Sequence, residues 1–321
     1  MEGRHNGGEA MTAPATCAGN VSAVDWIPEI RPCPICGQTR YHPLGTRGGR
    51  SHHSGLGVET HVVRCRGCHG VYSRPCLLPT ANPYREHSTE EYFRIHEPSS
   101  KIEAGRALAH RASEILGRRG RMLELGCGRG ELLTAAQRAG WTVRGVEMTE
   151  AFAKAATTAG LEIEAACVEN CRSLDERWDA IVLAAVLEHL YEPRASLARV
   201  FAALVPGGIA FVDVPNECSL WSRVGNAYMR ARGRPWAVNL SPTFPPYHVV
   251  GFCPRSLRFL AKAIGFEVVD FQTHRWRNEL TPRRSLVGRM ESLGAEAVLS
   301  LGAWTGSGAG ITAWLRRPGS G

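Results

Sequence analysis

The stretch from Arg121 to Glu147, RMLELGCGRGELLTAAQRAGWTVRGVE, constrains the fold of this chain more than any other. Glycines directly after a strand let the backbone turn sharply and let a ligand approach closely, while the following helix presents its N-terminal amides. The stretch predicts half of a nucleotide-binding α/β unit. Its expected elements are a strand at 121–125, a loop with Gly126, Gly128 and Gly130, a helix at 131–139, and a strand at 142–146.

Acidic residues around this loop separate the possible ligands. Glu147, at the tip of the second strand, can accept both hydroxyls of a ribose, at about the 20-residue spacing expected from the first glycine. A dinucleotide loop would carry a third glycine where this chain has Glu131, and Glu124 precedes the loop. These carboxylates would repel a pyrophosphate but suit a ribose, an ammonium and a sulfonium. The sequence therefore predicts S-adenosylmethionine as the cofactor.

Three motifs resemble one enzyme class. E-L-G-C-G-R-G at 124–130, the strand end at Glu147, and A-V-L-E-H-L at 185–190 resemble class I S-adenosylmethionine-dependent methyltransferases, particularly the branch with the ubiquinone-biosynthesis O-methyltransferases. The resemblance covers about residues 104–317. It implies a Rossmann-like, doubly wound α/β sheet of seven strands and methyl transfer to a small-molecule acceptor, with O-methylation in secondary or quinone-like metabolism as the expected reaction. The motifs specify the cofactor and leave the acceptor open.

We expect the cofactor to lie against the loop, the following strand ends and the segment after the fourth strand. The residues concerned are Glu124, Gly126, Cys127, Gly128, Gly130, Glu147, Met148, Cys167, Val168, Ala185 and Glu188. Similar enzymes often carry an Asp near the end of the third strand, where a carboxylate receives the adenine amino group. Here Cys167 takes that position, so the adenine contact stays open among Cys167, Val168 and Glu169.

Two cysteine pairs predict a metal site before this domain. Cys33-Pro-Ile-Cys36 and Cys65-Arg-Gly-Cys68 can each form a knuckle that presents two thiolates, and two knuckles complete the tetrahedral Cys₄ site of structural Zn²⁺. Four thiolates close the coordination shell, so the ion would not be catalytic. A segment of about 50 residues has too little core to fold by burial alone, so metal binding would supply much of its folding free energy.

Two histidines are candidate bases for the acceptor. The apolar run 179–186 predicts a central parallel strand, and His189 follows it in the crevice where such sheets bind ligands. The sequence equally allows His189 to be structural. P-P-Y-H at 245–248, followed by F-C-P-R-S-L at 252–257, resembles a stretch of the same methyltransferase branch, which makes His248 the first choice. A base of near-neutral pKa would suit a phenol or enol acceptor.

The predicted organisation has four parts. Residues 1–24 are expected to be a disordered tail, 25–80 a zinc-ribbon-like module, 81–100 a linker, and 101–317 the methyltransferase domain. Within that domain, 217–250 is expected to be a lid whose aromatic residues wall an apolar acceptor or shield the cofactor. A stripe of Leu286, Met290, Leu293, Ala297 and Leu301 is expected to pack in the core.

Composition bounds the location and the partners. No apolar run reaches the roughly 18 residues that span a membrane, and the N-terminus lacks a signal-peptide core, so we expect a cytoplasmic protein. The net charge of +8 comes almost wholly from scattered arginines, which does not favour a nucleic-acid partner. The sequence gives no indication of oligomeric state.

Three alternatives to the small-molecule enzyme remain. The first is an RNA methyltransferase, since ribosomal RNA guanine methyltransferases resemble this chain in carrying a Cys-rich module before the same domain. The second is a relative of the sugar C-methyltransferases, which pair a Cys₄ zinc module with this domain but have a large additional C-terminal domain. The third is a non-catalytic S-adenosylmethionine-binding protein.

Overall fold

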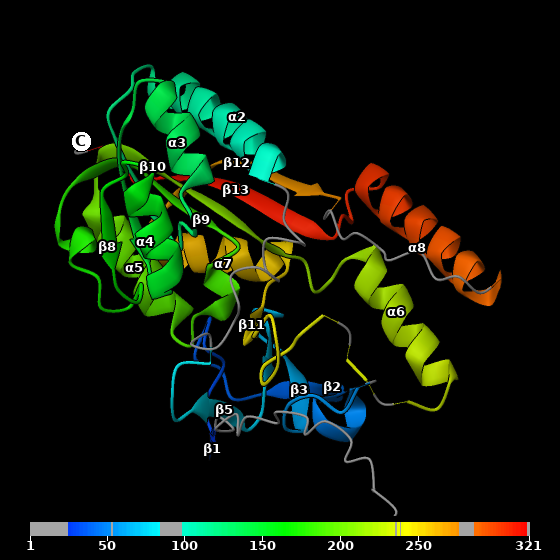
Figure 1. The fold of residues 1–321 in the computed structure, drawn as a ribbon. Coiled ribbons are helices and arrows are strands. Elements are labelled where there is room, and N and C mark those ends of the chain that lie inside the picture. The colour runs from blue at the N-terminus through cyan, green and yellow to red at the C-terminus, as the bar shows by residue number, and fades with distance from the viewer. Residues whose placement is uncertain are drawn as a thin grey trace, which may run out of the picture.

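The computed structural model describes residues 25–52, 54–83, 98–234, 236–237, 239–275 and 286–319. The tail expected at 1–24 and most of the linker expected at 81–100 lie outside the described residues. Three sheets are present in the described chain, with seven, four and two strands. Figure 1 shows the large sheet with its helices above the smaller sheets.

The seven-stranded sheet confirms the expected fold class. Its strand order is β12-β13-β10-β9-β6-β7-β8. The pairings among β10, β9, β6, β7 and β8 are parallel, and β13 runs antiparallel to both of its neighbours. The strands are β6 (Arg121–Leu125), β7 (Thr142–Glu147), β8 (Ile163–Ala165), β9 (Trp178–Ala184), β10 (Leu204–Pro215), β12 (Glu267–His274) and β13 (Gly310–Arg316).

Helices cover both faces of this sheet because its inner strands alternate buried side chains between two cores. Leu123 and Leu183 belong to a core with residues of α5 and α7, whereas Met122 and Val182 belong to a core with residues of α2, α3 and α4. This is the doubly wound arrangement. The helices are α2 (Pro98–Leu116), α3 (Glu131–Arg138), α4 (Glu150–Thr158), α5 (Pro193–Ala203) and α7 (Pro254–Ile264), with short 3₁₀ turns η1 (Gly49–Ser51), η2 (Arg172–Asp175) and η3 (Leu187–His189).

The N-terminal strands form two small sheets. β1 (Trp26–Glu29) pairs with β5 (Cys76–Pro79), and the four-stranded sheet has the order β11-β4-β3-β2. Its members are β2 (Tyr41–Arg47), β3 (Thr60–Cys65), β4 (Val71–Ser73) and β11 (Val250–Gly251). The strand β11 comes from the end of the expected lid, so a segment from far along the chain completes the N-terminal sheet.

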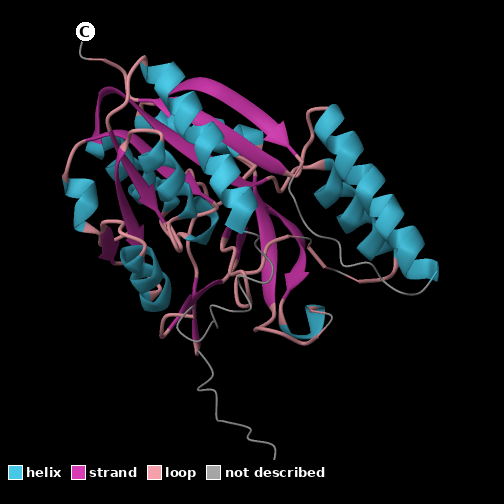
Figure 2. Ribbon diagram, turned by 45° about the horizontal axis from the view of Figure 1, so that its top comes forward, coloured by secondary structure: helices cyan, strands magenta, loops and turns pink. Residues whose placement is uncertain are grey.

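The helices α6 (Leu220–Ala231) and α8 (Leu286–Trp304) pack against each other and stand away from the large sheet (Figures 1 and 2). The expected core stripe on α8 is wrong at Leu293, which is 71% exposed, and at Leu301, which is 50% exposed. The buried side of α8 instead carries Leu299 and Gly302, where a Cβ would lie 3.3 Å from Leu220. Leu293 and Leu301 lie off this side and are left uncovered, and the side chains of Leu286 and Met290 lie outside the described ones.

Within the described residues, none of the helices combines the length and the apolar character needed to cross a membrane.

Candidate functional site

The glycine loop between β6 and α3 adopts the turn that the sequence predicts. Gly126, Gly128 and Gly130 all have positive φ, a conformation that strains residues with a side chain. The amides of Gly126 and Cys127 both donate to the carbonyl of Val146, at 2.8 and 3.1 Å, which holds the loop against β7. A Cβ on Gly126 would lie 2.8 Å from Cγ2 of Val186, so this position has no room for a side chain.

Glu147 closes the loop from the tip of β7. Its carboxylate accepts hydrogen bonds from the amide of Gly128 at 2.9 Å and from the amide of Thr149 at 2.7 Å. The side chain is buried, at 6% exposure. A carboxylate has about four acceptor positions, so two such bonds leave others for the hydroxyls of a bound ribose.

Glu124 places a second carboxylate under the loop. It is 5% exposed, and its Oε2 has no hydrogen-bond partner among the described residues. Burial, with repulsion from Glu131 and Glu147, raises its pKa well above the ordinary range, against the attraction of Lys101. A buried acceptor without a partner is costly, and a bound ammonium would satisfy it.

The other expected cofactor residues lie at the ends of neighbouring strands. Ala165 of β8 pairs with Glu147, which brings Cys167 and Val168 to the same edge. Cys167 and Met148 are exposed, whereas Val168 is 8% exposed and packs in the core beneath α5. Ala185 follows β9 with a φ of 55°, an uncommon conformation for a residue with a Cβ. The roles of these residues stay predictions.

Three side chains converge beyond the carboxyl end of β9. Oε1 of Glu188 lies 3.9 Å from Nε2 of His189 and 4.0 Å from Nε2 of His248, and the two imidazole rings make an edge contact with centroids 4.9 Å apart. Both carboxylate oxygens of Glu188 lack a hydrogen-bond partner among the described residues, and the residue is 1% exposed. The structure thus brings together the two candidate bases, His189 and His248, of which the sequence made His248 the first choice.

Burial sets the protonation of this cluster. It raises the pKa of Glu188 to about 8, with a smaller contribution from the charge of Asp213. It lowers the pKa of His189 to about 4 and that of His248 to about 3. Both imidazoles are therefore neutral near pH 7, and the near-neutral pKa expected for the base is wrong because desolvation disfavours the imidazolium.

The hydrogen bonds around the cluster show what it can do. Nδ1 of His189 lies 3.3 Å from the carbonyl oxygen of Tyr247, which can only accept, so Nδ1 carries the proton and Nε2 is an acceptor. One ligand atom from each of Glu188, His189 and His248 lies within 4.8 Å of the others. Such a set of acceptors can take a proton from a substrate hydroxyl, share one proton, or hold a cation.

Sequence reasoning missed the residues that hold this cluster. Ser241 accepts the amide of His248 through its hydroxyl at 3.1 Å, and Tyr247 holds His189 from a backbone with a φ of 64°. The carbonyl of Asp213, in β10, accepts the amide of Ala185 at 2.9 Å. The P-P-Y-H segment was the only signal for Tyr247, and it drew attention to the histidine alone.

The four predicted cysteine ligands come together. The Sγ atoms of Cys33 and Cys68 are 3.5 Å apart, those of Cys36 and Cys65 are 3.4 Å apart, and all four lie within 4.8 Å of one another. The amides of Gly67 and Gly70 donate to Cys65 Sγ and Cys68 Sγ, at 3.3 and 3.4 Å. Amide donors of this kind stabilise thiolates, so the donor set fits a tetrahedral Zn²⁺ site.

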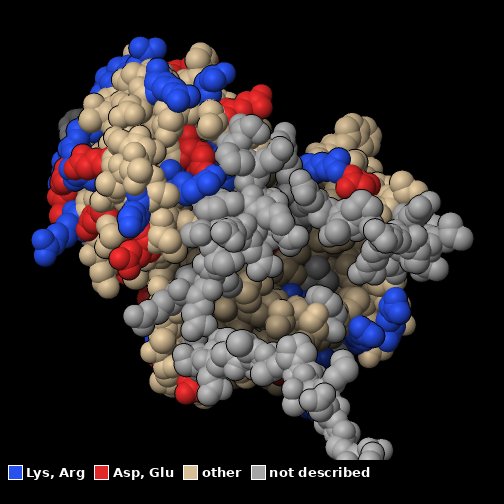
Figure 3. All heavy atoms as spheres, in the orientation of Figure 1, with Lys and Arg blue, Asp and Glu red and all other residues tan. Residues whose placement is uncertain are grey.

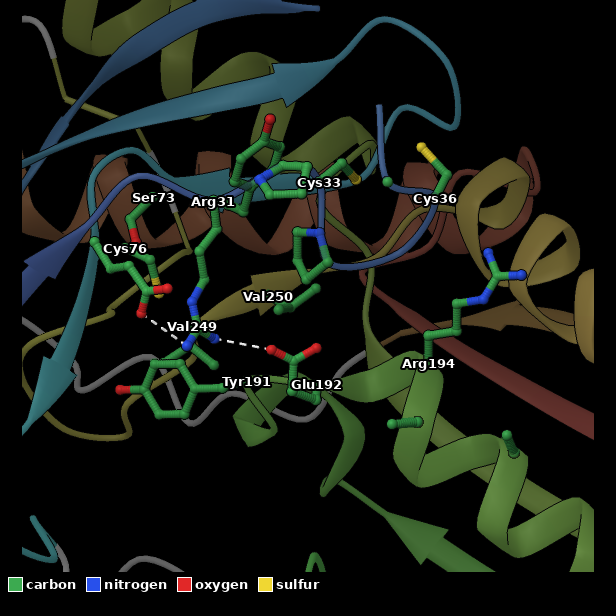
Figure 4. Close-up of a pocket in the computed structure, with 17 residues that line it drawn as sticks. Arg31, Cys33, Cys36, Ser73, Cys76, Tyr191, Glu192, Arg194, Val249 and Val250 are labelled. Atoms are coloured by element: carbon green, nitrogen blue, oxygen red, sulfur yellow. Dashed lines mark hydrogen bonds and ion pairs between the residues drawn. The ribbon is translucent and has the colours of Figure 1, made fainter. Parts of the chain in front are cut away.

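A cavity of about 680 Å³ lies beside these cysteines, away from the glycine loop. Figure 4 shows Arg31 reaching across it to Glu192, with Cys33 and Cys36 on one side and Arg194 of α5 on the other. Val249 and Val250 form part of its wall, so it separates the cysteine module (residues 25–80) from α5. Its lining includes none of the predicted cofactor residues.

The mainly parallel sheet, the glycine loop before α3 and the carboxylate of Glu147 at the next strand tip define the class of S-adenosylmethionine-dependent methyltransferases. The chain belongs to the methyltransferase-domain family: residues 96–270, more than half of its length, match the family described as "Methyltransferase domain".

Two curated relatives share the name ubiquinone biosynthesis O-methyltransferase. The protein of Actinobacillus pleuropneumoniae serotype 5b is 32% identical over 123 residues, 34% of this chain and 51% of that protein. The protein of Bordetella avium is 32% identical over 129 residues, 37% of this chain and 52% of that protein. The chain thus spans about half the length of the curated relatives it matches.

Solved structures of methyltransferases are also similar. An S-adenosylmethionine-dependent methyltransferase from Archaeoglobus fulgidus has a TM-score of 0.48 and 20% identity, covering 71% of this chain and 97% of that one. The plantazolicin methyltransferase BpumL in complex with SAH has a TM-score of 0.48 and 12% identity, covering 72% and 88%.

Proposed function

We propose that this chain transfers the methyl group of S-adenosylmethionine to a hydroxyl oxygen of a small molecule. The observation that carries the proposal is the cluster of buried Glu188 with the part-buried His189 and His248 beyond the end of β9, with both imidazoles neutral near pH 7. The printed name of the curated relatives, O-methyltransferase, supports an oxygen acceptor.

The residues around the loop support the cofactor assignment. Glu147 keeps acceptor positions for ribose hydroxyls, and the partnerless Oε2 of Glu124 fits the ammonium of the methionine part. Cys167, exposed after β8, is the proposed neighbour of the adenine. When bound, S-adenosylmethionine supplies a methyl group already activated by its sulfonium.

The chain then supplies alignment and a proton acceptor. Nε2 of His248 accepts the hydroxyl proton as the oxygen attacks the methyl carbon; the carbon–sulfur bond breaks, and the sulfonium becomes a neutral thioether. The proton leaves His248 to water. An ionised Glu188 stabilises the imidazolium that forms in this step, as a carboxylate beside an imidazole does in other enzymes. His189, fixed through Nδ1 by Tyr247, faces the same space and is the second candidate base.

We also propose that Cys33, Cys36, Cys65 and Cys68 hold a structural Zn²⁺. The mutual distances of the four Sγ atoms and the amide donors at Gly67 and Gly70 support this ion. The charges give less support to an RNA acceptor: on the face in Figure 3, Lys and Arg lie in separate groups with acidic residues between them. A phosphate-tracking surface would gather them into a stripe.

A transfer assay over phenols, enols, sugars and RNA tests the proposal. We expect methylation of a phenol or enol, and a loss of about 10²–10⁴-fold in kcat for His248→Ala, as expected for removal of a general base. SAH affinity should stay unchanged. His110→Ala is the control, because His110 is an exposed histidine of α2. Methylation of RNA alone, or an undiminished rate in His248→Ala, would contradict the proposal.

A further inference from the structure

We infer that the cysteine module positions His248. Residues 239–252, here called the strap, carry His248 and are held in place by contacts with the module. Metal binding at the four cysteines therefore controls the acceptor side of the site. The inference rests on the proposed function, because it gives the module its role through His248. The role inferred for the module is one of positioning, since none of its four clustered cysteines is proposed to contact the acceptor.

The first contact between strap and module is a pair of short strands. Val250 and Gly251 of β11 pair with Tyr72 and Val71 of β4. The fit is close, because a Cβ on Gly251 would lie 3.1 Å from Cβ of Val71 and 2.3 Å from Cγ of Glu217. The strap therefore ends as the edge strand of the module's own sheet, two residues after His248.

The cysteine knuckle leads directly into this pairing. β4 begins three residues after Cys68, and the amide of Cys65 donates to the carbonyl of Gly70 at 2.9 Å. Gly70 in turn donates its amide to Cys68 Sγ at 3.4 Å. The start of β4 is thus fixed by the same turn that presents two thiolates, and without a metal this turn would lose its main constraint.

The other end of the strap is also held by the module. The hydroxyl of Thr243 donates to the carbonyl of Val58 at 2.9 Å and accepts the amide of Val58 at 3.0 Å. Nε of Arg47 donates to the carbonyl of Leu240 at 2.5 Å, and its guanidinium lies over the ring of Phe244. Phe244 is 5% exposed, so this lid aromatic packs on the module.

Between these two ends the strap carries the groups that orient both histidines. The amide of Val249 donates to the carbonyl of Glu188 at 2.9 Å, and the Tyr247 carbonyl holds His189. Tyr247 keeps a positive φ, and its ring lies 6.3 Å from that of Trp26 in β1. A backbone in this conformation persists only where its surroundings hold it. Here the surroundings belong to the module on one side and to η3 on the other.

The module itself is tied to the large domain near the strap. Nη1 of Arg31 lies 2.8 Å from Oε1 of Glu192, and the hydroxyl of Tyr191 donates to the carbonyl of Leu77 at 3.2 Å. Figure 4 shows Tyr191 and Glu192 facing Arg31, with Val249 and Val250 beside them. The strap is therefore held between the cysteine module and the large domain. Of these two, only the module depends on the metal for its fold.

Amide hydrogen exchange of the full-length protein tests the inference. Zinc-loaded protein, chelator-treated protein and Cys65→Ser are compared, with Cys76→Ser as the control, because Cys76 lies in β5 outside the four-sulfur cluster. We expect metal loss to speed exchange in 60–73 and 239–252 but not in 121–147. Transfer should fall at least about 10-fold, since a misplacement of about 1 Å can cost about 10²-fold, whereas SAH affinity should change by less than about twofold.

A second variant keeps the cysteines and separates the strands. Gly251→Val should push β11 from β4, speed exchange in 239–252 and lower transfer while the zinc content stays complete; Gly294→Ala, in open space on α8, is the control. Unchanged exchange in 239–252 after metal loss would overturn the inference. If metal loss loosens 239–252 but zinc-loaded wild type methylates no hydroxyl acceptor, the coupling stands and the proposed function fails.

Discussion

Oε1 of buried Glu188 lies 4.0 Å from Nε2 of His248, whose side chain is 17% exposed, and the two groups form no hydrogen bond with each other. A buried carboxyl group without a partner costs stability. Such a cost is retained where the group serves function. The pair is therefore where activity and stability should oppose each other.

The first prediction concerns this pair. Glu188→Gln removes the carboxylate that stabilises the imidazolium and supplies an amide donor that can occupy Nε2 of His248. Above the raised pKa of Glu188 of about 8, where the carboxylate is ionised, we expect transfer to fall about 10–10²-fold, within the usual range for disturbing acid–base catalysis. Because the amide can donate to Nε2 of His248 and cannot become a buried charge, the melting temperature should rise. Thermal unfolding and single-turnover transfer measure the two effects, and a fall in both would show that Glu188 is structural.

The second prediction is the pH dependence of transfer. His248 must be neutral to accept a proton, and burial lowers its pKa to about 3, so the acid limb of kcat/KM should lie far below the ordinary histidine range. Between about pH 5 and 7 the rate should be nearly flat. As Glu188 ionises around its raised pKa of about 8, the rate should increase, and Glu188→Gln should remove that step. An acid limb near pH 6.5 would contradict the lowered pKa of His248.

The third prediction separates crowding from backbone strain at the loop. Gly126 and Gly160 both have positive φ, so replacing either by Val costs roughly 1–2 kcal/mol of backbone strain. Only at Gly126 would the new side chain collide, with Val186. Gly126→Val should therefore weaken SAH binding more than about 100-fold, which is roughly 2.7 kcal/mol, in calorimetry. Gly160→Val should bind SAH normally, and equal losses in both variants would point to general destabilisation.

The large sheet could be predicted because its signals are local. The segment 121–147 carries strand, turn and helix patterns in direct succession, and β9 is apolar except for Asp179. The two C-x-x-C spacings predicted the four cysteines that come together, Cys33, Cys36, Cys65 and Cys68, and their role as metal ligands stays a prediction.

The acceptor side could not be predicted for physical reasons. The pairing of β11 with β4 joins strands of two and three residues through their backbones, which side-chain patterns do not encode. The spacing of apolar residues along α8 indicates an apolar stripe but does not indicate what covers it. Leu293 in that stripe is exposed. The low pKa values of His189 and His248 arise from burial by distant segments.

The last prediction concerns an ion pair across the antiparallel strand. Nε2 of His274 in β12 lies 2.9 Å from Oδ1 of Asp213 in β10. Burial opposes protonation of His274, but the hydrogen bond and the charge of Asp213 outweigh it, so the net pKa of His274 is raised. A raised folded pKa means that the pair stabilises the native state fully below the unfolded value of about 6.5, and that this stabilisation is lost as the pH rises through the folded pKa.

His274→Gln tests this direction of the pH dependence. The substitution leaves Asp213 in place, whose charge also raises the pKa of Glu188. In urea unfolding, the wild type should be more stable than the variant at pH 5.5, and the difference should shrink steadily toward pH 9. His110→Gln, at an exposed histidine of α2, provides the background change expected from any lost imidazole. A difference that grows with pH would mean that His274 is held neutral, since a lowered pKa stabilises the fold only where the imidazole is deprotonated.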